Sequence, residues 1–148
     1  MSKAEESLSH FSCGNSCAQS ILMTFGKEYF KNTDDAARLA AGFEAGLAFR
    51  GEVCGAVSGA MMVIGLKYGH SGPADELAKE RLYKLTNTFL ADFESKCGST
   101  SCNKLLNVDI STEEGINEAI RNNSFATICP NAIKTSSQIL ENIFAVNR

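Results

Sequence analysis

The chain has 148 residues, of which 44% are hydrophobic and 21% are charged, and its formal net charge is -3. This composition is typical of a globular protein and argues against a disordered chain or a membrane protein. Because the chain carries no excess of basic residues, binding to nucleic acids or to anionic membranes is also disfavoured.

The first eleven residues, MSKAEESLSHF, contain acidic residues where a secretory signal has a basic and then an apolar region. We therefore expect a cytoplasmic protein whose thiols stay reduced. The longest apolar stretch, residues 53–66, is shorter than the ~20 residues that a membrane-spanning helix needs. It predicts a buried helix and no membrane insertion.

Helical patterns follow one another along the chain. The first predicted helix covers residues 16–26. The second begins with Thr33 as its N-cap and continues with acidic residues in its first turn. The third covers residues 53–68, and small residues recur along it at every fourth position: Gly51, Gly55 and Gly59. Such a stripe lets a second helix approach closely.

The clearest break in the chain follows, at residues 69–73. Its glycine-then-proline order is typical of one helix ending and another beginning. A long amphipathic helix is expected from Pro73 to about Lys96, because large apolar residues recur there every three to five positions. A short helix is expected at residues 102–106.

Ser111 and Glu114 have the spacing of a capping box and predict a helix that ends near Asn122. The last predicted helix covers residues 131–146. Alternating patterns typical of strands are nearly absent. The sequence therefore predicts an all-α fold: a single domain, residues 1–148, folded as a compact irregular bundle of about five to seven helices.

Six cysteines, at positions 13, 17, 54, 97, 102 and 129, are scattered over at least four predicted elements. No two have the CxxC spacing of redox motifs or zinc ribbons, so any cysteine site must be assembled by folding. Cys17 and Cys54 lie at or near predicted helix starts, and Cys129 directly precedes Pro130. Backbone amides and the helix dipole favour a thiolate there, which can bind a metal, attack a disulfide or react with an oxidant.

Four segments form a recognisable series: GNSCAQSIL, GFEAGLAFRGEVCGAVSGAMMVIGLKYG, FESKCGSTSCNKLL and a lone cysteine before the last helix. The series resembles the CGAxxG family of four-cysteine redox-active proteins (C_GCAxxG_C_C), with CGAVSG at residues 54–59 as its centre. The resemblance implies a helical domain with a redox or metal function. It places the four characteristic cysteines of the family on Cys17, Cys54, Cys102 and Cys129.

A similar domain accompanies haem in split-Soret cytochromes, where an iron–sulfur centre is described. This chain has no CxxCH motif, so haem attachment is not expected. Four thiolates suit an iron–sulfur cluster or a tetrahedral zinc site, because soft sulfur ligands select these metals. Our leading prediction is that the four family cysteines bind a metal or cluster for electron transfer or sensing.

Two alternatives stay open. If only two thiols approach each other, the protein is a thiol–disulfide oxidoreductase acting on a partner protein, and Cys17 with Cys54 is the expected catalytic pair. Cys13, four residues before Cys17, is then a candidate resolving thiol on the same helix face. In the second alternative the cysteines, Cys97 included, are inert and buried, and the domain is structural.

The histidines, the acidic pairs and the apolar residues near Gly46 are not expected to take part in chemistry. His10 and His70 are expected to be solvated, and the adjacent acidic residues in predicted first turns are expected to stabilise helices. Phe43, Leu47 and Phe49 lie among glycines and predict an apolar surface, which suits a homodimer.

Overall fold

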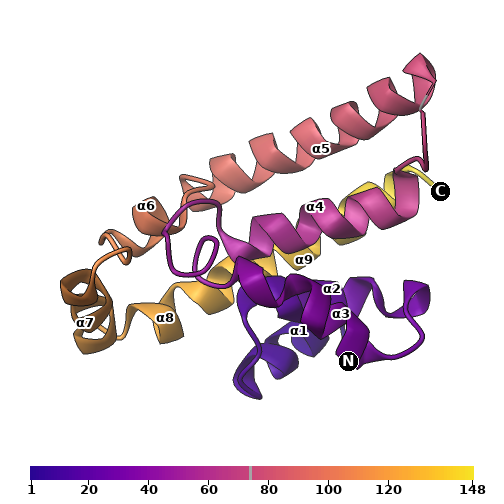
Figure 1. Cartoon of the computed structure of the whole chain (residues 1–148). Coiled ribbons are helices and arrows are strands. Elements are labelled where there is room, and N and C mark those ends of the chain that lie inside the picture. Colours follow the sequence, from indigo (N-terminus) through magenta and orange to yellow (C-terminus); the bar gives the residue numbers. More distant parts are fainter. Residues whose placement is uncertain (74) are drawn as a thin grey trace.

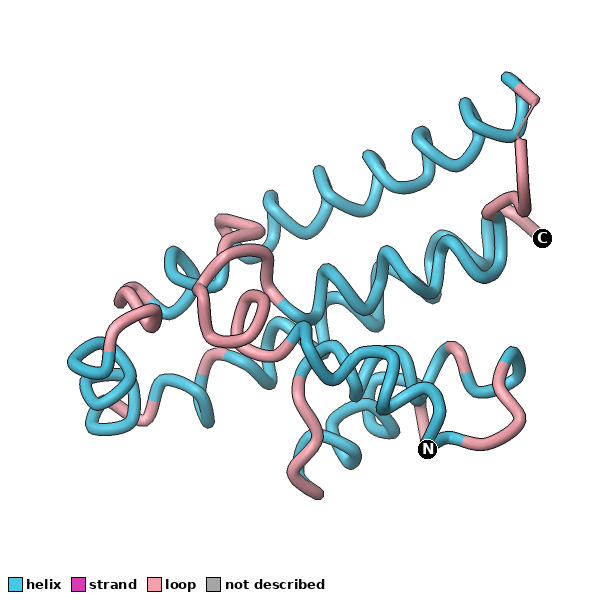
Figure 2. Tube along the Cα trace, in the orientation of Figure 1, coloured by secondary structure: helices cyan, strands magenta, loops and turns pink. Residues whose placement is uncertain are grey.

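Helices make up most of the computed structural model, which describes residues 1–73 and 75–148 (Figure 1). Figure 2 shows helices joined by loops, and no strand is present in the part of the chain that is described. The predicted all-α fold is therefore confirmed. None of the described helices has the length and apolar character needed to cross a membrane.

The helices in the described residues are α1 (Lys3–Ser12), α2 (Cys17–Phe25), α3 (Thr33–Ala40), α4 (Gly55–Tyr68), α5 (Glu76–Cys97), α6 (Cys102–Leu106), α7 (Glu113–Arg121), α8 (Ser124–Thr127) and α9 (Cys129–Val146). Two 3-10 turns, Lys27–Tyr29 and Ala41–Phe43, flank α3. The sequence did not predict α1 or α8. The N-terminal signal for α1 is nevertheless present, because Ser2 and Glu5 form a capping box.

Two helices begin one residue away from the predicted cap. Asn32, rather than Thr33, caps α3 by accepting a hydrogen bond from the amide of Asp35. Thr112, rather than Ser111, caps α7 by accepting from the amide of Gly115 at 3.0 Å, and the Ser111 hydroxyl instead donates to Asp109 at 2.6 Å. The acidic residues expected in these first turns are Asp34, Asp35, Glu113 and Glu114, and they lie there.

The two longest helices also begin at positions that differ from the prediction. α5 starts at Glu76, where Asp75 caps it by accepting from the amide of Ala78 at 2.7 Å. Ala74, which the predicted helix included, lies outside the described residues. α9 starts at Cys129, two residues earlier than expected, because Pro130 is well suited to a first turn, where its missing amide hydrogen needs no acceptor.

Helices α2 and α4 pack closely through glycine. A Cβ atom on Gly55 would lie 2.9 Å from the Ala18 nitrogen, and one on Gly59 would lie 2.9 Å from the Ala18 oxygen. The predicted packing stripe is confirmed for these two glycines. Gly51, the third member, lies in the loop before α4.

Buried side chains form two hydrophobic clusters. The larger joins α2, α3, α4, α5 and α9 and contains Ile21, Ile64 and Phe89. The smaller lies at the α6–α8 end of the molecule and consists of Cys102, Leu106, Ile110 and Ala119. In Figure 1, α6, α7 and α8 lie together beyond the first turns of α4 and α9.

The backbone between α3 and α4 contains a left-handed segment, residues 45–49. Its φ angles are all positive: Ala45 (51°), Gly46 (70°), Leu47 (75°), Ala48 (47°) and Phe49 (63°). Only glycine adopts this region freely, and another residue is disfavoured by about 1–2 kcal/mol. Backbone hydrogen bonds, including Phe49 N to Glu44 O at 3.1 Å and Glu52 N to Gly46 O at 2.9 Å, hold the segment.

Candidate functional site

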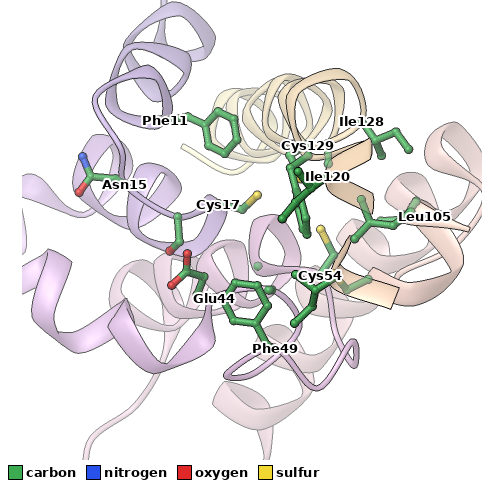
Figure 3. Close-up of a pocket in the computed structure, with 18 of the residues that line it drawn as sticks. Phe11, Asn15, Cys17, Glu44, Phe49, Cys54, Leu105, Ile120, Ile128 and Cys129 are labelled. Atoms are coloured by element: carbon green, nitrogen blue, oxygen red, sulfur yellow. The ribbon is translucent and has the colours of Figure 1, made fainter. Parts of the chain in front are cut away.

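One cavity of about 450 Å³ is lined by all four cysteines of the predicted site, Cys17, Cys54, Cys102 and Cys129. Figure 3 shows the sulfur atoms of Cys17 and Cys54 directed toward its interior. The fold thus brings together residues that are separated by up to 112 positions in the sequence. Cys13 and Cys97 are not among the residues that line the cavity.

Each of the four cysteines stands at the start of a different helix. Cys17, Cys102 and Cys129 are the first residues of α2, α6 and α9, and Cys54 is the N-cap of α4. Serine N-caps fix two of these helix starts: Ser16 accepts from Gln19 N, and Ser101 accepts from Lys104 N. The positive ends of three long helices, α2, α4 and α9, therefore meet at the cavity and favour negative charge on sulfur.

The cavity lies where the two hydrophobic clusters meet. Cys54 belongs to the larger cluster, and Cys17 packs against it. Cys102 belongs to the smaller cluster, and Cys129 packs against that one. Each cluster therefore contributes two thiols to the site.

Two of the thiols are deeply buried. Cys54 is 5% exposed and Cys102 is 8% exposed. Burial raises the pKa of each thiol from an ordinary value of 9.0 to about 12. The amides of Ala56 and Val57 oppose the rise at Cys54 by favouring its thiolate. In the absence of a cation, both groups stay protonated at neutral pH.

The other two thiols interact directly. Cys17 donates a hydrogen bond to the sulfur of Cys129, which lowers the pKa of Cys129. The same bond, together with burial, raises the pKa of Cys17. The sequence predicted a pair of Cys17 with Cys54, whereas this hydrogen bond pairs Cys17 with Cys129. No sequence signal marks that pairing, because it depends on how α2 and α9 pack in three dimensions.

The remaining walls of the cavity are mostly apolar and were not predicted. Phe11, Phe49, Leu105, Ile120 and Ile128 surround the thiols in Figure 3. Glu44 is the one ionisable side chain other than cysteine among the lining residues. Because these side chains come from separate elements, no local motif in the sequence identifies them.

The two remaining cysteines lie apart from the cavity. Cys13 caps the end of α1 and is exposed. The prediction that Cys13 shares a helix face with Cys17 is wrong, because Cys13 follows α1, Cys17 begins α2, and Gly14 at a φ of 100° lies in the turn between them. Cys97 is half-buried at the end of α5, and burial raises the pKa of its thiol.

The four cysteines line a cavity of about 450 Å³. Within residues 1–73 and 75–148, no group of three or more histidine, cysteine, aspartate or glutamate side chains is gathered tightly enough to hold one metal ion. The cavity lining nevertheless includes four thiols, which are the soft donors that zinc and iron–sulfur clusters prefer.

Comparison with known proteins identifies a family. No match is found among curated proteins or among solved structures. A family model matches residues 15–143, a range that contains all four lining cysteines and the left-handed segment. The chain therefore belongs to the family described as "Putative redox-active protein (C_GCAxxG_C_C)".

Proposed function

We propose that Cys17, Cys54, Cys102 and Cys129 bind a metal in the form of an iron–sulfur cluster, which serves electron transfer or sensing. The supporting observation is that four thiols from four separate helices line one cavity. A dithiol mechanism needs two thiols, so it leaves the other pair unexplained. When bound, such a cluster supplies one-electron chemistry.

The electrostatics of the site support a cationic occupant that replaces thiol protons. Burial raises the pKa of Cys54 and of Cys102, so their thiolates need a cation to compensate their charge. The helix starts at Cys17, Cys54 and Cys129 would stabilise the negative charge of the ligated sulfurs. A single zinc ion needs four sulfurs about 2.3 Å away, whereas a cavity of about 450 Å³ favours a larger group.

We expect protein purified without oxygen to contain iron and acid-labile sulfide and to absorb visible light. Substituting any of the four lining cysteines by serine should remove most of the iron, because serine supplies a hard oxygen ligand. Cys13→Ser and Cys97→Ser are the matched controls, since neither residue lines the cavity. Zinc without sulfide would instead indicate a zinc site, and metal-free protein under these conditions would contradict the proposal.

The hydrogen bond from Cys17 to Cys129 favours a second candidate function, thiol–disulfide exchange. The Cys129 thiolate would attack the disulfide of a partner protein, forming a mixed disulfide and releasing one partner thiolate. Cys17 would then displace the second partner sulfur. The products are a Cys17–Cys129 disulfide and two partner thiols, so the electron count balances.

Oxidising the metal-free protein in a glutathione buffer should link Cys17 to Cys129, and peptide mass spectrometry should detect the linked peptides. Cys17→Ser should trap a mixed disulfide on Cys129 because the resolving thiol is gone. Cys54→Ser should leave the linkage intact. A disulfide between Cys17 and Cys54 would show that the hydrogen-bonded pair is not the reactive one.

We further propose a cytoplasmic location and a redox partner protein, since all six cysteines are free. Leu47 and Phe49 are 42% and 38% exposed, and Phe49 lines the cavity. An apolar surface beside the site favours contact with a partner or with a second copy of the chain.

A further inference from the structure

We propose that the left-handed segment, residues 45–49, is a gate over Cys54 and Cys102 that opens to let the site be loaded and then closes on it. Ala45 and Phe49 line the cavity. The backbone at Gly46 lies directly on Cys102, since a Cβ atom at Gly46 would lie 2.8 Å from the Cys102 Cβ. The segment is therefore a wall of the cavity on the side of its most buried thiols.

The thiols of Cys54 and Cys102 offer little surface to a reagent or a metal, so a movement of the cavity wall would make them easier to reach. Cys54 and Cys102 are 5% and 8% exposed. Most other wall residues belong to helices, such as Leu105 on α6 and Ile120 on α7. Opening such a wall disrupts a hydrophobic cluster. Opening the left-handed segment breaks mainly backbone hydrogen bonds and, among its side chains, the packing of Ala45 against the smaller cluster.

The closed segment combines strain with few apolar contacts. Four non-glycine residues, Ala45, Leu47, Ala48 and Phe49, have positive φ angles. Leu47 and Phe49 stay substantially exposed. Two hydrogen bonds fasten the residues that follow the segment to α6: Cys102 N donates to Glu52 O at 2.6 Å, and Asn103 N donates to Gly51 O at 3.0 Å. Strained segments with exposed hydrogen bonds are among the first to open locally.

The identity of the group that passes the gate, iron and sulfide, rests on the proposed function. The movement of the gate can be tested without that group. Metal-free, reduced, full-length protein would be treated with iodoacetamide at a fixed pH. The labelling rate of each cysteine would be followed by peptide mass spectrometry. Exposed Cys13 is the internal reference, because its labelling needs no opening.

Ala48→Gly should slow the labelling of Cys54 and Cys102 about fivefold, because glycine relieves the strain of the closed form at a φ of 47°. Gly46→Ala should speed their labelling about tenfold or more, because its Cβ would lie 2.5 Å from Glu52 N, 2.7 Å from Gly51 C and 2.8 Å from Cys102 Cβ, which the closed form cannot accommodate. Ala91→Gly, on the exposed face of α5, is the matched control. Ala91→Gly weakens the whole fold by about 1 kcal/mol, or about fivefold in the ratio of folded to unfolded protein, because glycine is a poor residue for a helix interior. If the two thiols react through the gate, it should leave both of their labelling rates unchanged.

Two results would overturn the gate. In the first, Ala91→Gly speeds the labelling of Cys54 and Cys102 about fivefold, which means that they react only through global unfolding. In the second, Ala48→Gly leaves both rates as they are. Ala48→Gly keeps the test decisive even if Gly46→Ala does not fold. If the labelling rates follow the gate variants but the protein never contains metal, the cluster proposal is refuted and the gate proposal is not.

Discussion

Replacing Gly59 by alanine should lower the free energy of unfolding by about 1–3 kcal/mol. The added Cβ would lie 2.9 Å from the Ala18 oxygen and 3.0 Å from the Ile21 Cβ. Neither contact can be relieved by rotating a flexible side chain, so α2 and α4 must separate. Urea denaturation followed by circular dichroism measures the change. The same separation moves Cys17 away from Cys54, so the iron content should also fall.

Gly65→Ala provides the matched control on the same helix. Nothing lies within 4 Å of a Cβ atom at Gly65. Alanine there should raise the free energy of unfolding by about 0.5–1 kcal/mol, because glycine is a poor residue for a helix interior. If the two substitutions had equal effects, close packing would not be the reason for glycine at position 59.

Metal-free, reduced protein should lose stability as the pH rises above 9. The Cys54 thiol loses its proton near pH 9.0 when unfolded, but at about pH 12 when folded. Above pH 9 the unfolded state therefore binds fewer protons, and each pH unit favours it by about 1.4 kcal/mol. Between pH 9 and pH 10.5, burial of Cys54 should thus lower the free energy of unfolding by about 2 kcal/mol.

The comparison with Cys54→Ser isolates this effect. Serine does not titrate in the range and is a good N-cap for α4, so other alkaline effects should be shared by the two proteins. The difference between their free energies of unfolding, measured in urea at each pH, should shift by about 2 kcal/mol over the range. Parallel curves would show that the Cys54 thiol is not as strongly perturbed as its burial implies.

Much of the fold follows from patterns within single helices. Apolar periodicity and glycine breaks predicted α2 through α7 and α9, although two N-caps were wrong by one residue. α1 was missed because its apolar stripe is short and only partly buried, at Leu8 and Phe11, and its fully buried residue is the polar Ser7. The left-handed segment could not be predicted, because four of its five residues are not glycine.

The membership of the site followed from the resemblance to the family, which named four cysteines that folding places around one cavity. The sequence predicted helix starts at or near Cys17, Cys54 and Cys102, whereas α9 begins at Cys129, two residues before its predicted start. The hydrogen bond between Cys17 and Cys129 depends on how their helices pack. The same is true of the apolar walls, so sequence patterns could not reveal either feature.

The position of the cavity between the two hydrophobic clusters gives an occupant a mechanical role. Cys17 and Cys54 are fixed to the larger cluster, and Cys102 and Cys129 are fixed to the smaller one. A group bonded to all four sulfurs would cross-link these halves, and its binding energy would become part of the folding energy of both. The empty protein would then unfold in two steps, beginning at the α6–α8 end, and the loaded protein would unfold in one. Proteases that cut the partly unfolded chain would remove empty molecules first, so the lifetime of the protein would follow its supply of ligand.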